Sequence, residues 1–123
     1  MEKVLLPSPG EGLSESYIPK IMIVDDDEEH LQLIKLIMLR EGLTCELFLC
    51  HRARQALEFL AGTAVDLVLL DVMMPDLDGF QVLDQLKDNP DTANIPVIIL
   101  TSTQETDYVV RAFAHGAVDY ISK

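Results

Sequence analysis

Short apolar runs alternate with amphipathic segments along most of this chain. The apolar runs have the length and the branched residues of buried strands, and they occupy residues 21–24, 44–49, 66–70, 96–100 and 117–121. The segments between them repeat apolar residues at helical spacing, over residues 27–41, 52–60, 79–87 and 105–115. This alternation predicts an α/β fold with a doubly wound five-stranded parallel sheet and right-handed crossovers.

The composition of single strands indicates where each of them lies in the sheet. Residues 66–70 are almost continuously apolar, which is typical of a central parallel strand that is buried on both faces. Residues 44–49 are less uniform, so we expect this strand to lie nearer an edge. Glycines at the ends of three predicted helices provide stop signals, and they are Gly42, Gly62 and Gly116.

The first part of the chain differs from the rest. Residues 7–12 read Pro-Ser-Pro-Gly-Glu-Gly, which is rich in turn-forming residues and has no periodicity. We therefore divide the chain into an N-terminal extension, residues 1–18, which we expect to be mobile, and one globular domain, residues 19–123. Within the extension, residues 4–6 are apolar and could dock on an apolar surface.

Charge and composition narrow the classes of function. The 123 residues include 21 acidic and 9 basic side chains, for a net charge of −12, which argues against direct nucleic acid binding by this chain. The same balance suits cation binding and the attraction of basic partners. Cys45 and Cys50 fit no zinc or disulfide pattern, so we expect free thiols. No apolar stretch is long enough to span a membrane, and we expect a cytoplasmic protein.

Acidic residues follow two of the predicted strands. Asp25, Asp26 and Asp27 come directly after the first strand, and Asp71 comes directly after the third. In open α/β sheets, ligands bind at the carboxyl ends of the strands. If the two strands are neighbours, these carboxylates converge, and such a cluster repels itself unless a hard cation or a proton occupies it. Taken singly, the aspartates after the first strand could simply begin a helix, and Asp71 could simply be a turn residue.

Four segments of the chain together resemble the receiver domain of two-component response regulators. They are Ile-Val-Asp-Asp at 23–26, Leu-Leu-Asp-Val-Met-Met-Pro-Asp-Leu-Asp-Gly at 69–79, Pro-Val-Ile-Ile-Leu-Thr-Ser at 96–102, and Gly-Ala-Val-Asp-Tyr-Ile-Ser-Lys at 116–123. They occur in the order and at the spacing of the family. The resemblance implies a flavodoxin-like sheet with strand order 2-1-3-4-5, in which the first and third strands are adjacent.

The resemblance also implies a metal and phosphate site. Asp71 would be the phosphate acceptor. The cofactor would be Mg²⁺, bound by Asp26, by Asp71 and by the backbone carbonyl of Met73, with Asp25 assisting through water. An aspartate can form an aspartyl phosphate, and Mg²⁺ would offset the repulsion between two anions.

Residues at the other strand ends would complete the mechanism in the same family scheme. Thr101 and Lys123 would contact the phosphoryl group. A hydroxyl contact from Thr101 would open space into which the ring of Tyr120 can turn, so Thr101 and Tyr120 would form the switch that changes a partner-binding surface. We expect Asp76 and Asp78 to be structural.

The function implied is a phosphoacceptor switch of a two-component phosphorelay. A sensor histidine kinase or a phosphotransfer protein would donate the phosphoryl group. The domain would assist its own phosphorylation and dephosphorylation without being an enzyme on an outside substrate. An output domain or effector outside this chain, and a homodimer, are partners that the resemblance allows. The alternative is a receiver-like interaction module that signals without phosphate.

Two other classes fit the residues less well. A phosphatase of the haloacid dehalogenase type needs a second aspartate two positions after the nucleophile, where this chain has Met73. A flavin or dinucleotide protein would need a glycine-rich loop after the first strand. The histidines His30, His51 and His115 share no spacing, and we expect them to be helix-surface residues.

The family pattern continues past the final lysine with a proline and a fifth helix, both missing in this sequence. We therefore expect a domain truncated after the fifth strand, cut from a larger regulator. One face of the sheet would be covered by the first helix alone and would be partly bare. We also expect association or reduced stability, and a Lys123 side chain that is poorly held.

Overall fold

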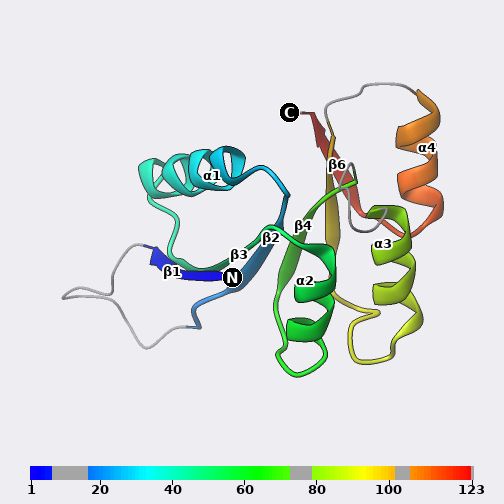
Figure 1. Cartoon of the computed structure of the whole chain (residues 1–123), viewed down its shortest axis with the longest axis horizontal. Helices are drawn as coiled ribbons and strands as arrows, with labels where there is room; N and C mark the ends of the chain where they lie inside the picture. The colour runs from blue at the N-terminus through cyan, green and yellow to red at the C-terminus, as the bar shows by residue number, and fades with distance from the viewer. Residues whose placement is uncertain (7–16, 73–78, 102–105, 123) are drawn as a thin grey trace.

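The structure is a computed structural model that describes residues 1–6, 17–72, 79–101 and 106–122. The strands of this part of the chain are β1 (Glu2–Leu6), β2 (Lys20–Val24), β3 (Cys45–Cys50), β4 (Leu67–Asp71), β5 (Val97–Thr101) and β6 (Asp119–Ser122). The helices are α1 (Glu28–Arg40), α2 (Ala53–Leu60), α3 (Gly79–Asp88) and α4 (Thr106–Ala114). The strands form one six-stranded sheet in the order β1-β3-β2-β4-β5-β6 (Figure 1).

The strands from β2 onward confirm the predicted topology. The pairs β3–β2, β2–β4, β4–β5 and β5–β6 are all parallel, which gives the order 2-1-3-4-5 when counting starts at β2. β2 and β4 are adjacent, and the register pairs Val24 with Leu70. The residues that follow this pair, Asp25 and Asp71, therefore leave the sheet side by side at its carboxyl edge.

The first strand corrects two predictions. Residues 1–18 were expected to be a mobile extension, yet Glu2–Leu6 forms β1 and pairs antiparallel with β3. The sheet is therefore six-stranded and mixed rather than five-stranded and parallel. β3 is the second strand from the edge formed by β1, in line with the expectation that it lies nearer an edge. The Leu6 side chain is buried and the Glu2 carboxylate contacts Gln32 and Lys35 of α1, which explains why this short strand docks. Residues 7–16 of the predicted extension lie outside the described residues.

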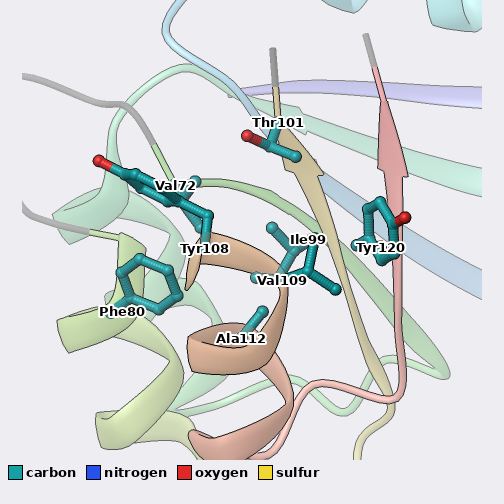
Figure 2. A pocket seen from close by; sticks show the side chains of 8 residues that line it. All are labelled: Val72, Phe80, Ile99, Thr101, Tyr108, Val109, Ala112 and Tyr120. Carbon is teal, nitrogen blue, oxygen red and sulfur yellow. The ribbon is translucent and has the colours of Figure 1, made fainter. Parts of the chain in front are cut away.

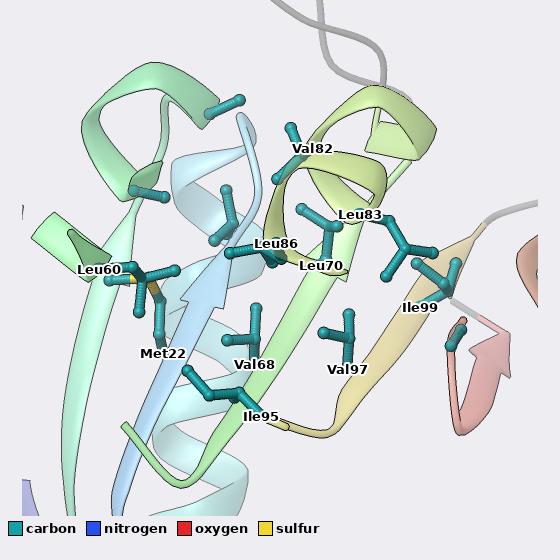
Figure 3. Packing of buried hydrophobic residues seen from close by; sticks show 14 of the residues in the cluster. Met22, Leu60, Val68, Leu70, Val82, Leu83, Leu86, Ile95, Val97 and Ile99 are labelled. Atoms are coloured by element: carbon teal, nitrogen blue, oxygen red, sulfur yellow. The ribbon is translucent and has the colours of Figure 1, made fainter. Parts of the chain in front are cut away.

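The larger core lies between the sheet and helices α2, α3 and α4. Its strand residues alternate with those that face α1, as the pleat of a sheet requires. Leu83 and Leu86 of α3 point toward Leu70 on β4 and toward Val97 and Ile99 on β5 (Figure 3). This packing fixes the carboxyl ends of β4 and β5, where the candidate site lies.

Among the described residues, α1 is the only helix on the opposite face of the sheet (Figure 1). It buries Leu31 and Met38 against β2 and β3. The expectation of a partly bare face is confirmed, since Leu69 and Ile98 are half-buried and Ile121 is 48% exposed. An apolar groove runs between α1 and the ends of β5 and β6.

The cysteines and the helices complete the description of the fold. Cys45 and Cys50 are both buried and neither is in a disulfide, as predicted for thiols outside a disulfide framework. In the part of the chain that the structure describes, every helix is too short or too polar to cross a bilayer.

Candidate functional site

Three carboxylates meet where β2 and β4 end. Asp25 directly follows β2, Asp26 is the next residue, and Asp71 is the last residue of β4. One carboxylate oxygen from each of these residues lies within 4.8 Å of the other two. The convergence that the sequence predicted is therefore present, and it follows from the adjacency and register of the two strands.

The three carboxylates differ in burial. Asp25 is fully buried and Asp71 is 2% exposed, whereas Asp26 is exposed. The Asp25 backbone is held by a 3.0 Å hydrogen bond from its N–H to the carbonyl of Cys50 on β3. The site is therefore buried where the strands end, and it is open to solvent at Asp26.

The start of α1 shapes one wall of the site. Asp27 is the N-cap of the helix, and its side chain accepts the backbone N–H groups of Glu29 and His30. The N–H of Asp27 in turn donates to Oδ1 of Asp25 at 3.0 Å. The start of α1 therefore also holds the carboxylate of Asp25 in place.

The donor set suits a hard divalent cation. All side-chain ligands in the cluster are carboxylate oxygens, which Mg²⁺ and Mn²⁺ accept and which are poor ligands for soft metals. Crowded carboxylates repel one another, and a bound cation would lower that repulsion. The residues therefore fit the ion class that the sequence suggested.

A small apolar pocket lies beside the site. Thr101 ends β5, next to the pair formed by Leu100 and Asp71, and its side chain is buried. Thr101 and Tyr120 both line this pocket, with Tyr108 of α4 opposite them (Figure 2). The Tyr120 ring is half-buried and its hydroxyl points away from Thr101 in Figure 2. The two residues predicted to form the switch therefore share one cavity.

Two predicted site residues fall outside the described residues. They are Met73, whose backbone carbonyl was expected to bind the ion, and Lys123, which was expected to contact the phosphoryl group. Asp76 and Asp78, expected to be structural, also lie outside the described residues.

Two histidines have partners that sequence reasoning missed. His30 Nδ1 lies 2.8 Å from Oδ2 of Asp25, so His30 is not simply a helix-surface residue. His115 pairs with Asp84 and packs against the ring of Phe80. No spacing rule predicts either contact, because both depend on how a helix is placed relative to a turn or to another helix.

Comparison with known proteins gives the family. The model of the response regulator receiver domain matches residues 21–123. The chain belongs to the response regulator receiver family. Its described part shares the receiver fold, with β1 preceding the matched region.

Curated relatives cover a range of regulators. A probable cyclic di-GMP phosphodiesterase of Vibrio cholerae is 40% identical over 106 residues, which are 84% of this chain and 23% of the relative. The regulatory protein VanRc of Enterococcus gallinarum is 36% identical over 104 residues, 85% of this chain and 43% of the relative. This receiver chain therefore spans less than half the length of these relatives.

Solved structures agree with this assignment. The Mn²⁺-bound form of response regulator Rcp1 is 28% identical, with a TM-score of 0.78 over 85% of this chain and 81% of that chain. The phosphorylated cyanobacterial phytochrome response regulator RcpA is 25% identical, with a TM-score of 0.80 over 87% of this chain and 81% of that chain.

Proposed function

We propose that this receiver domain is a phosphoacceptor switch in which Asp71 accepts a phosphoryl group. One observation carries the proposal: Asp71 ends β4 as a nearly buried carboxylate, within 4.8 Å of two further carboxylates. Like charges this close repel one another and burial weakens their solvation, so a bound divalent cation would stabilise the cluster.

The chemical step is a phosphoryl transfer to a carboxylate. One Asp71 oxygen attacks the phosphorus atom, an O–P bond forms, and the bond between phosphorus and the donor breaks. With a phosphohistidine donor, the electron pair of that bond stays on the imidazole nitrogen. Hydrolysis by water later regenerates the carboxylate and releases phosphate.

We infer that the acidic cluster holds Mg²⁺ for this step. Asp26 and Asp71 would be direct ligands and Asp25 would act through water, while the backbone carbonyl of Met73 stays a predicted ligand. A bound divalent ion would neutralise charge between the carboxylate and the phosphoryl oxygens. The exposed Asp26 leaves one side of the cluster open to the phosphodonor.

The pocket beside Thr101 supports a readout of the phosphorylated state. The Thr101 hydroxyl could donate to a phosphoryl oxygen on Asp71, since the two residues lie on neighbouring strand ends. Movement of Thr101 would enlarge the pocket that it shares with Tyr120. The ring of Tyr120 would then turn inward and change the surface of α4 and β6. Lys123 stays a predicted contact of the phosphoryl group.

The proposed partners follow from the proposed chemistry. A sensor histidine kinase or a phosphotransfer protein would supply the phosphoryl group, and an output domain or effector would recognise the altered surface. The domain would speed reactions of its own phosphate and would not turn over an outside substrate.

Intact mass measurement tests the proposal. The chain is incubated with acetyl phosphate and Mg²⁺, and we expect one added phosphoryl group. The adduct should be absent with a chelator and absent in Asp71→Asn. Asp91→Asn, which changes an exposed aspartate on the α3–β5 connection, is the matched control and should retain the adduct.

Other outcomes would favour other functions. Rapid multiple turnover of acetyl phosphate would indicate a phosphatase. Absence of an adduct with acetyl phosphate and with a phosphorylated phosphotransfer protein would favour the interaction module that signals without phosphate.

A further inference from the structure

We propose that His30 is a positioning residue of the acidic site, which holds Asp25 in the orientation that divalent cation binding requires. The inference rests on the proposed function in one respect, namely that the cluster of Asp25, Asp26 and Asp71 binds such an ion. His30 itself is not a ligand in this proposal, because it acts on the ion only through Asp25.

The two oxygens of Asp25 are held by two different groups. Oδ1 accepts the backbone N–H of Asp27 at 3.0 Å, and Oδ2 lies 2.8 Å from Nδ1 of His30. A carboxylate oxygen is an acceptor, so Nδ1 of His30 is the donor in this contact. These two hydrogen bonds, on different oxygens, restrain both the rotation and the tilt of the carboxylate plane.

His30 has contacts of its own that restrain its position. Its backbone N–H bonds to Oδ1 of the N-cap Asp27, which places His30 in the first turn of α1. Its ring is half-buried at the end of the groove that Ile34, Leu100 and Ile121 also line. These contacts place the imidazole beside Asp25, so the position of α1 also sets the position of the donor to that carboxylate.

Because Asp25 is fully buried, the hydrogen bond from His30 influences how its carboxylate faces a bound ion. A carboxylate has about four acceptor positions, so Asp25 can keep both hydrogen bonds and still face Asp26 and Asp71. Groups that hydrogen-bond to metal-site carboxylates set ligand geometry, and losing one typically weakens metal affinity about 10-fold to 100-fold. A purely structural role for His30 would change stability and leave ion affinity unaltered.

The test measures ion binding directly. Mn²⁺ is the probe, because the free ion is counted by electron paramagnetic resonance, and Mg²⁺ affinity follows from competition. We expect His30→Leu to raise the Kd for Mn²⁺ about 10-fold. His30→Asn places an amide N–H near the position of Nδ1, and it should recover most of the affinity.

The matched controls are His115→Leu and His115→Asn. His115 makes the same type of contact through Nδ1, but to Asp84, which is outside the acidic cluster. Both His115 variants should bind Mn²⁺ as the unmodified chain does. Circular dichroism without any ion checks that each variant is folded.

A second measurement uses the unmodified chain and keeps the proposal testable if His30→Leu does not fold. The ring signals of His30 in a nuclear magnetic resonance spectrum should shift during a Mg²⁺ titration with the Kd of the site. The ring signals of His51 and His115 should stay in place.

Three results would overturn the inference. The first is equal or tighter Mn²⁺ binding by His30→Leu, and the second is a His30 ring signal that does not respond to Mg²⁺. Either result leaves the proposed function standing if the chain still binds the ion and accepts a phosphoryl group. The third is that the unmodified chain binds no Mn²⁺, and this would remove the Mg²⁺ role in the proposed function as well.

Discussion

Gly79, the first residue of α3, lies against the backbone of Val72, the residue that follows Asp71. The backbone N–H of Gly79 donates to the carbonyl oxygen of Val72 at 3.3 Å. A Cβ atom on Gly79 would lie 2.3 Å from Cα of Val72 and 2.8 Å from the carbonyl oxygen of Asp71. Only a residue without a side chain allows this approach, and it occurs immediately beside the proposed phosphate acceptor.

Gly79→Ala should therefore be destabilising. We expect it to lower the free energy of unfolding by about 1–3 kcal/mol, because the added methyl group must displace backbone atoms. Gly62→Ala is the matched control, since a Cβ there would meet nothing within 4 Å. Urea denaturation of both variants measures the difference, and equal stability would show that the backbone at Val72 and Gly79 adjusts to the methyl group without cost.

The strand β1 makes a second testable contribution. Leu6 is 4% exposed and packs under α1. Leu6→Ala should lower the free energy of unfolding by about 2 kcal/mol, at the lower end for buried leucines, because the site lies at a strand end. Leu43→Ala, at a position that is 47% exposed, should change it by about 0.5 kcal/mol or less. If β1 is detached in solution, the two variants will have equal thermal midpoints.

The Asp66 carboxylate links stability to pH. Oδ2 of Asp66 accepts the backbone N–H of Lys20 at 2.8 Å and the hydroxyl of Tyr17 at 2.7 Å. These bonds, chiefly the one from Lys20, hold the pKa of Asp66 below its usual value. The unfolded chain therefore binds the proton first, and the contribution is present above about pH 4 and is lost as the pH falls through the lower, folded-state pKa.

Asp66→Asn should consequently be less stable than the unmodified chain at neutral pH, with a gap that narrows in acid. Tyr17→Phe removes one of the two donors and should show a smaller gap with the same trend. Denaturation midpoints between pH 7 and about pH 3 measure both. A gap that widens as the pH falls would contradict the proposed cause.

The switch pocket allows phosphorylation and readout to be separated. Thr101→Ala should still accept a phosphoryl group at Asp71, but it should lose most of the change in the Tyr120 ring signals that follows phosphorylation. Thr101→Ser keeps a hydroxyl and should restore that change. Nuclear magnetic resonance of the ring protons, before and after acetyl phosphate, reports it. An unaltered response in Thr101→Ala would mean that Thr101 is not the sensor.

Local patterns in the sequence predicted most of the fold. The apolar runs and helical repeats located β2 to β6 and all four helices within a few residues. The central place of β4 in the sheet followed from its unbroken apolar residues, but its burial on both faces was overestimated, since Leu67 and Leu69 are half-buried. The strand order came from the family resemblance, since no local pattern states which strands pair.

The parts that could not be predicted depend on long-range contacts. Glu2–Leu6 is a short stretch with two charged residues, and it becomes a strand only because β3 offers it a partner. The contact between His30 and Asp25 likewise depends on the angle at which α1 leaves the turn. Asp25, Asp26 and Asp71 were predictable because the sheet topology alone brings them together.

The most direct test of the central claim is to identify the residue that carries the phosphoryl group. The chain is treated with acetyl phosphate and Mg²⁺ and is then reduced with borohydride, which converts an aspartyl phosphate to homoserine. Peptide sequencing by mass spectrometry locates the change. We predict homoserine at position 71 alone, dependent on Mg²⁺. Homoserine at Asp25, Asp26 or another aspartate, with Asp71 unchanged, would contradict the role proposed for Asp71.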